Sequence, residues 1–295
     1  MTQSVSCGEA LISLLESYDV DTVFGIPGVH TLDLYRGLAH SNIRHVQARN
    51  EQGAGFMADG YARLGGKPGV CVLISGPGVT NACTPMGQSF ADSIPVLMIS
   101  STTASYSLGK GWGCLHEVTD LEAVTRPLTA LSATAGSPDD LEELIGQAFS
   151  IFASERPRPV HIAIPIDVLA QPVSTTWQRR VVPAPPAPAG SAIREAAALL
   201  QQAERPLIYA GGGAVNAAPT LTEIAERLDA AVITTTAGKG VVPDSHPLCV
   251  GGGIVRSQAR DFLAQADVIL AIGTEMSETD SFVERLTLNG QLIRV

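Results

Sequence analysis

Apolar positions follow two different spacings along the first half of the chain. Spacings of three and four residues predict amphipathic helices, and short continuous apolar runs predict buried strands. The predicted helices span residues 6–18, 31–38, 51–64, 79–91 and 138–154, and the predicted strands span residues 21–24, 44–48, 70–74, 95–99 and 159–165. Strands and helices that alternate in this way favour a parallel sheet with helices on both faces. Residues 100–113 are polar and rich in glycine, which predicts a surface loop.

The same alternation returns after a stretch rich in proline. Helices are predicted at residues 192–203 and 220–228, and strands at residues 206–210, 231–235, 267–273 and 292–295. Residues 172–190 contain Pro172, Pro183, Pro185, Pro186 and Pro188, which predicts a semi-rigid, extended linker. We therefore expect an α/β protein with two doubly wound parallel-sheet domains, residues 1–171 and 191–295.

Composition and charge narrow the classes of function. The net charge is −10 and no basic block occurs, so nucleic acid is not expected as a partner. No apolar run has the roughly 18 residues of a membrane span, and the N-terminus lacks the features of a signal peptide. The five cysteines show no metal-binding spacing, so we expect no metal site, free thiols and a reducing, cytoplasmic location.

The candidate chemistry lies where predicted strands end. Gly25–Gly28, Glu51 and Gly76–Gly78 each follow a predicted strand. Parallel sheets bind ligands at the carboxyl ends of their strands, so these segments could share one site. Taken alone, Glu51 is better explained as a residue of the first helical turn that the helix dipole favours.

Three sequence strings favour a functional role for Glu51 over the structural explanation. RNEQGAGFMADGYAR, GVCVLISGPGVTN and FADSIPV closely resemble the pyrimidine-binding domain of thiamine-diphosphate (ThDP) enzymes, in the acetolactate-synthase-like group. TTTAGKG, PDSHPL and ADVILAIG resemble the central domain of that family. The resemblance implies that residues 1–171 are the pyrimidine-binding domain and that residues 191–295 are an incomplete central domain. The C-terminal diphosphate-binding domain, with its Mg²⁺ ligands, is expected to be absent from this chain.

The resemblance also assigns roles to residues. Glu51 would hold N1′ of the cofactor's aminopyrimidine and activate ThDP for attack on a 2-oxo acid. The other residues that would contact the cofactor are Gly25, Ile26, Pro27, Gly28, Ser75, Gly76, Pro77, Gly78 and Asn81. The full-length enzyme would be a lyase or transferase, a decarboxylase or an acetolactate-type carboligase, and would assemble as a homodimer or homotetramer. Residues 1–295 alone are expected to be inactive.

Two histidines are candidates for the substrate side of the site. His30 follows Pro27-Gly28-Val29, and His116 stands where acetolactate synthases often carry Gln in an FQE string. A histidine in a loop is more often a surface residue than a catalytic one, and this explanation is favoured for both. The string Leu115-His116-Glu117 departs from the acetolactate-synthase pattern and puts acetolactate formation in question. CLHE and FGIPGVHTLDLYRGL most resemble the 5-guanidino-2-oxopentanoate decarboxylase type.

Two alternatives from other classes stay open. Gly211–Gly213 follows a predicted strand and could approach a phosphate, so a catalytically silent module that binds FAD or a nucleotide is the main alternative. The segment does not match GxGxxG, which disfavours an NAD-dependent dehydrogenase. FAD is therefore conceivable for the central domain, but no motif supports it.

Overall fold

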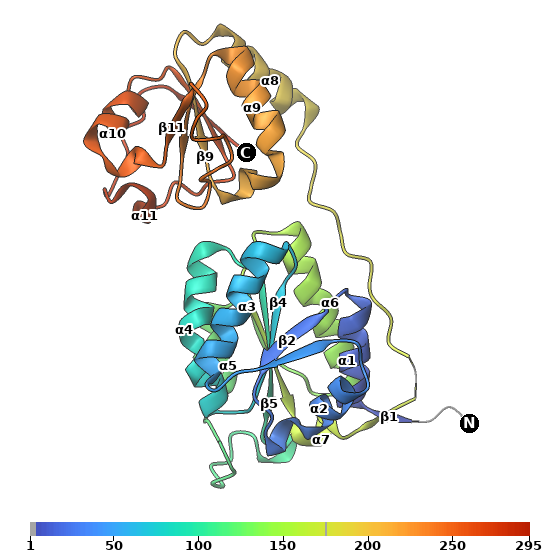
Figure 1. The fold of residues 1–295 in the computed structure, drawn as a ribbon. Helices are drawn as coiled ribbons and strands as arrows, with labels where there is room; N and C mark the ends of the chain where they lie inside the picture. The colour runs from blue at the N-terminus through green and yellow to red at the C-terminus, as the bar shows by residue number, and fades with distance from the viewer. Residues whose placement is uncertain (1–3, 175) are drawn as a thin grey trace. The chain divides into compact units, whose positions relative to one another are not determined.

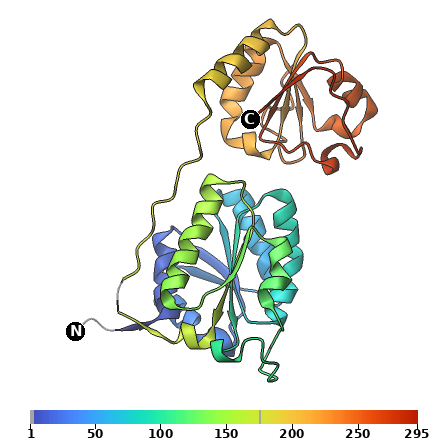
Figure 2. The same ribbon diagram turned by 180° about the vertical axis from the view of Figure 1, so that it is seen from behind.

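The computed structural model describes residues 4–174 and 176–295, which divide into two compact units. The first unit ends at Pro186 and the second begins at Ala187. Each unit is a parallel sheet with helices on both faces (Figures 1 and 2). The predicted α/β class with two doubly wound sheets is therefore confirmed.

The first unit contains a six-stranded sheet in the order β3-β2-β4-β5-β7-β6, with every neighbouring pair parallel. The strands are β2 (Thr22–Gly25), β3 (Arg44–Gln47), β4 (Gly69–Leu73), β5 (Val96–Thr102), β6 (Leu131–Thr134) and β7 (Val160–Pro165). The chain runs outward from β2 to β3 and then returns to form β4 on the other side of β2. Such a reversal of strand order leaves a crevice at the carboxyl ends of the two strands involved.

Alternating residues of the strands build two separate cores. Val70 and Val72 of β4 pack with the helices α1 (Cys7–Ser17), α2 (Leu32–Ala39) and α6 (Pro138–Ser154). Cys71 and Leu73 pack with the helices α3 (Glu51–Gly65), α4 (Pro77–Asp92) and α5 (Leu121–Thr125). Figure 1 shows these two sets of helices on opposite faces of the sheet. Burial on both faces explains why a central strand such as β4 is a continuous apolar run.

Helix starts agree with the capping residues in the sequence. Ser6 and Glu9 form a capping box at α1, in which the Ser6 hydroxyl accepts from the Glu9 amide and the Glu9 carboxylate accepts from the Ser6 amide. At α3, the side chain of Asn50 accepts a hydrogen bond from the Gln52 amide at 2.9 Å. Asn50 is thus the N-cap, as predicted, and Glu51 is the first residue of the helix.

The expectation of a surface loop over residues 100–113 is partly wrong. Strand β5 continues to Thr102, and the residues from Ser100 to Ala104 are buried. The polar side chain of Ser100 is tolerated there because its hydroxyl bonds to Nε2 of the buried His161 at 2.8 Å. The remainder of the segment is a loop that contains one short 3₁₀ turn, Ser105–Ser107.

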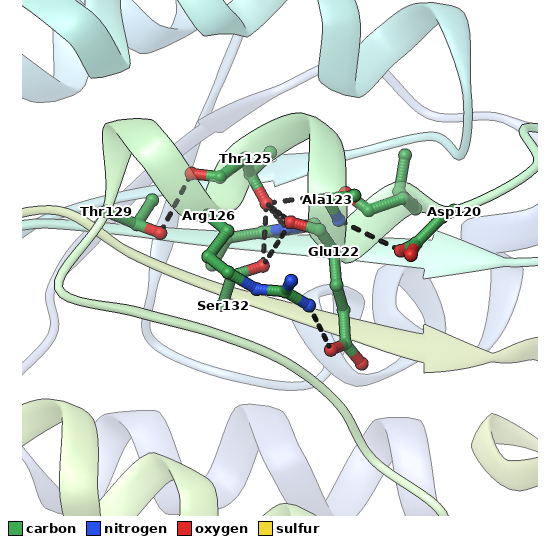
Figure 3. A network of polar contacts seen from close by, with 9 residues as sticks. Asp120, Glu122, Ala123, Thr125, Arg126, Thr129 and Ser132 are labelled. Carbon is green, nitrogen blue, oxygen red and sulfur yellow. Dashed lines mark hydrogen bonds and ion pairs between the residues drawn. The ribbon is translucent and has the colours of Figure 1, made fainter.

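Helix α5 and strand β6 were not predicted, and polar contacts join them (Figure 3). Asp120 caps α5 by accepting from the Ala123 amide at 2.9 Å. The Thr125 hydroxyl contacts the Ser132 hydroxyl at 2.7 Å and Nδ1 of His161 at 2.8 Å. Thr129 adds a hydrogen bond to the Thr125 carbonyl. The helix has five residues and the strand reads LSAT, so neither carries a clear apolar period.

Part of the segment expected as a linker packs on the first unit. Strand β8 (Pro172–Val173) pairs antiparallel with β1 (Val5–Ser6), directly after the short helix α7 (Ile166–Leu169). Trp177 is buried in the same core as α1 and α6. Val182 also packs against this core, four residues before the first unit ends at Pro186.

The second unit has a five-stranded parallel sheet in the order β11-β10-β9-β12-β13. Predicted elements within it are α8 (Gly190–Gln202), β9 (Pro206–Ala210), α9 (Ala218–Leu228), β10 (Ala231–Thr234), β12 (Val268–Ile272) and β13 (Gln291–Arg294). Elements that were not predicted are β11 (Cys249–Gly251), α10 (Ser257–Leu263) and α11 (Glu278–Ser281). Within the described ranges, no helix is long and apolar enough to cross a membrane.

Candidate active site

The loops that follow β2, β3 and β4 meet at the carboxyl edge of the first sheet. The β3 end is joined to the β2 end by a hydrogen bond of 3.0 Å from the Ala48 amide to the Gly25 carbonyl. The end of β4 continues into residues Ile74–Gly78, called here the turn Ile74–Gly78, which includes the first two residues of α4. These three loops surround the crevice between β2 and β4, where the fold places a ligand.

Glu51 lies at this edge with a carboxylate that is only partly hydrogen-bonded. Asn81 Nδ2, from the second turn of α4, donates to Glu51 Oε2 at 2.9 Å. Glu51 Oε1 makes no hydrogen bond to any residue that the structure describes. The side chain is half-buried. Asn81 therefore fixes one oxygen and leaves the other available to a ligand, so two residues predicted for the same cofactor do lie together.

The turn Ile74–Gly78 requires glycine at two positions. Gly76 has φ +56°, and a side chain there would place Cβ 2.3 Å from the carbonyl oxygen of His116. A Cβ on Gly78 would lie 2.7 Å from Cγ2 of Ile74 and 3.6 Å from Cγ of Glu51. The turn thus lies close to both Glu51 and the His116 segment.

Gly25 and Gly28, at the two ends of the loop after β2, have different surroundings. Gly25 is the buried last residue of β2. A Cβ at this position would lie 2.2 Å from the Val72 carbonyl oxygen. Close packing within the sheet therefore explains why residue 25 is a glycine. Gly28 lies beside the other loops, since a Cβ there would come within 2.5 Å of Cδ1 of Ile74. Between them, Ile26 is half-buried and Pro27 is exposed.

The two histidines named from the sequence lie close together. His30 Nδ1 contacts the hydroxyl of the buried Ser75 at 2.8 Å. The His30 and His116 rings are edge to face, with centroids 6.1 Å apart. Burial, and secondly the charge of His116, lower the pKa of His30, so this imidazole is neutral near pH 7.

Glu117 shapes the loop that carries His116, a contact that the sequence did not reveal. Its carboxylate accepts from the amides of Gly111 and Cys114, each at 2.9 Å. The loop lines an open cavity of about 660 Å³ that includes Lys110 and His116. The Nδ1 atom of His116 is buried without a hydrogen-bond partner among the described residues, and its backbone has φ +59°. Glu117 lies in an irregular loop, where no helical or strand periodicity could have indicated its role.

Among the residues that the structure describes, no group of three or more His, Cys, Asp or Glu side chains is arranged to hold a metal ion. In the second unit, Gly211 and Gly213 pack on Gly273: a Cβ on Gly211 would lie 2.2 Å from the Gly273 carbonyl oxygen. Close packing of two turns therefore accounts for these glycines without a bound phosphate.

Comparison with known proteins decides the family. Residues 5–123 match the thiamine pyrophosphate enzyme, N-terminal TPP binding domain, and residues 193–295 match the thiamine pyrophosphate enzyme, central domain. The chain belongs to the thiamine pyrophosphate enzyme family. The recognition made from RNEQGAGFMADGYAR and the accompanying strings is confirmed.

Several curated relatives of this family are similar along nearly the whole chain. A probable 2-ketoarginine decarboxylase of Pseudomonas aeruginosa is 56% identical over 295 residues, which cover 99% of this chain and 53% of the relative. An acetolactate synthase of Mycobacterium bovis is 37% identical, over 94% of this chain and 46% of the relative. The large subunit of acetolactate synthase isozyme 1 of Escherichia coli is 35% identical, over 97% and 52%. The chain thus spans about half the length of the curated relatives it matches.

Proposed function

We propose that the protein carrying this chain is a ThDP-dependent 2-oxo acid decarboxylase in which Glu51 activates the cofactor. The observation that carries the proposal is the Glu51 carboxylate at the β2–β4 crevice, with Oε2 held by Asn81 and Oε1 without a partner in the described chain. A carboxylate in this state can accept or return a proton at one defined atom.

The local geometry fits an aminopyrimidine ring. Glu51 Oε1 would hold N1′ and exchange a proton with it, and Asn81 would keep the carboxylate in the required orientation. The turn Ile74–Gly78 lies beside Glu51, so its backbone would border a ring held by that carboxylate. When bound, ThDP supplies the carbon nucleophile and the electron sink for loss of CO₂. The roles of Ile26, Pro27, Gly28 and Ser75 beside the ring belong to the same proposal.

Decarboxylation is favoured over acetolactate formation by the pattern of similarity. Identity is 56% with the probable 2-ketoarginine decarboxylase and 35–37% with the two acetolactate synthases compared above. His116, in place of the Gln expected for an acetolactate synthase, agrees with this preference. We therefore infer a 2-oxo acid with a guanidino side chain as the first substrate to test.

The remaining parts of the site would come from outside residues 1–295. We infer that a diphosphate-binding domain supplies the Mg²⁺ ligands, that the enzyme assembles as a homodimer or homotetramer, and that it acts in the cytoplasm. The alternative of a silent nucleotide- or FAD-binding module has less support, because the Gly211–Gly213 turn is explained by its contact with Gly273.

The test is CO₂ release by the complete gene product with ThDP and Mg²⁺. 5-Guanidino-2-oxopentanoate, pyruvate and 2-oxobutanoate would be compared at equal concentration, with product analysis for aldehyde and for acetolactate. We expect ThDP-dependent CO₂ release with the guanidino substrate preferred and the aldehyde as product. Absence of ThDP-dependent CO₂ release from all three substrates would contradict the proposed function. Acetolactate as the main product would contradict the decarboxylase assignment.

A further inference from the structure

A buried hydroxyl holds the imidazole of His30 at the edge of the candidate site. Ser75 is 1% exposed and its oxygen lies 2.8 Å from His30 Nδ1. No residue in the described chain forms a hydrogen bond with His30 Nε2, and this atom is not buried. One ring nitrogen is therefore committed to the protein, and the other is available to a ligand.

The contact with Ser75 can set which nitrogen carries the proton. If the Ser75 hydroxyl donates to Nδ1, the proton of a neutral imidazole must be on Nε2. The ring of His116 stands 6.1 Å away in an edge-to-face arrangement. Burial and the charge of His116 both lower the pKa of His30. With Ser75 as the donor, Nε2 is a neutral N–H donor with a fixed direction.

The donor and Glu51 adjoin the same short segment of the chain. The turn Ile74–Gly78 contacts Glu51 through Gly78 and the His116 segment through Gly76, and it carries Ser75 itself. Glu51, His30 and the His116 segment therefore all adjoin the same five residues of the chain.

We propose that His30 Nε2–H binds the carboxylate of the 2-oxo acid substrate and that Ser75 is the positioning residue that orients it. This role rests on the decarboxylase function proposed above. A neutral donor suits the reaction because the carboxylate loses its negative charge as CO₂ departs. A cation would stabilise the charged ground state more than the transition state and slow that loss.

The test measures KM and kcat for the 2-oxo acid in the complete gene product with ThDP and Mg²⁺. His30→Gln keeps an N–H near the position of Nε2, whereas His30→Asn places its amide near Nδ1, so the two variants separate the two nitrogens. We expect His30→Asn to raise KM roughly 10- to 100-fold, the effect of a lost hydrogen bond to a charged group. His30→Gln should recover most of that loss, and Ser75→Ala should fall between them. His40→Gln, on the exposed end of α2, is the control and should leave KM unchanged.

A second measurement follows the tautomer in residues 1–295, which contain the whole first sheet. Nitrogen-15 NMR of the imidazoles at pH 7 should show His30 neutral with its proton on Nε2, and Ser75→Ala should disturb this state. A proton on Nδ1, or unchanged KM in His30→Asn, would overturn the inference. Failure of the proposed function would be distinct, because the unsubstituted protein would then release no CO₂.

Discussion

At the scale of single residues, this site depends on backbone positions that exclude a side chain. Gly76 combines positive φ with a Cβ position only 2.3 Å from the His116 carbonyl oxygen. The sequence string SGPG showed that the turn is sharp, and the residue spacing placed it at a strand end. It could not show that the turn supports the His116 loop, because the two segments are about 40 residues apart in sequence.

Gly76→Ala should destabilise the first unit much more than Gly66→Ala. Both glycines have positive φ, at +56° and +64°, but no atom lies within 4 Å of a Cβ on Gly66. Gly66→Ala should therefore cost only the conformational penalty of about 1–2 kcal/mol, whereas Gly76→Ala must also displace the His116 backbone. Urea unfolding of residues 1–295 measures both free energies. Equal costs would contradict the close contact between the turn and the loop.

At the scale of elements, long periodic segments were predictable and short polar ones were not. Helix α6 begins and ends at the predicted residues, Pro138 and Ser154, because its apolar face and its cap at Ser137 are both evident in the sequence. Helix α5 and strand β6 were missed because they are fixed by side-chain contacts rather than by an apolar period. The Thr125 hydroxyl contacts Ser132 (Figure 3). It also contacts the buried His161. Tertiary hydrogen bonds determined these elements, and such bonds leave no local signal.

His161 should make the stability of the first unit depend on pH. It is fully buried, bonds to Ser100 and Thr125, and has a pKa lowered by burial to about 3. Because the folded state resists protonation while the unfolded chain titrates near 6.5, the unfolded state binds more protons between about pH 6.5 and pH 3. The free energy of unfolding should therefore fall as pH decreases through this window, by at most about 1.4 kcal/mol per pH unit from this group.

The measurement is the free energy of unfolding at pH 7 and pH 5 for the unsubstituted chain, His161→Gln and His40→Gln. The unsubstituted chain and the exposed His40→Gln control should lose stability between these values. His161→Gln should lose less over the same interval, even if its stability at pH 7 is lower. The same pH dependence in all three proteins would show that His161 is not the titrating group.

At the scale of the whole molecule, one exposed helix face remains without a partner in the described chain. Gly53, Phe56, Gly60 and Leu64 follow one another on α3 at spacings of three and four residues, which places them on one side of the helix. Phe56 is 42% exposed and Leu64 is 93% exposed, and a Cβ on Gly53 or Gly60 would meet no atom within 4 Å. Small residues around an exposed aromatic ring allow a second helix to approach closely.

We predict that residues 1–295 dimerise through this face of α3. Phe56→Asp should shift the mass measured by light scattering at micromolar concentration from dimer toward monomer, because a charge would be buried in an apolar contact. Phe262→Asp is the matched control, since Phe262 is 46% exposed on the second unit and far from α3 in sequence. A monomeric mass for the unsubstituted chain would refute the prediction.

The central claim is that Glu51 activates the cofactor, and its most direct test is the steady-state rate of Glu51→Gln in the complete gene product at saturating ThDP. Gln retains the size and a hydrogen-bonding end but cannot take up the proton, so the rate should fall by at least the ~10²–10⁴-fold of a positioned acid–base group. Asp139→Asn is the control, because Asp139 occupies the first turn of α6 as Glu51 does in α3. Both substitutions should change the free energy of unfolding by only about 0.3–1 kcal/mol. A Glu51→Gln rate close to that of the unsubstituted enzyme and of Asp139→Asn would contradict the account and leave Glu51 as a first-turn residue of the helix.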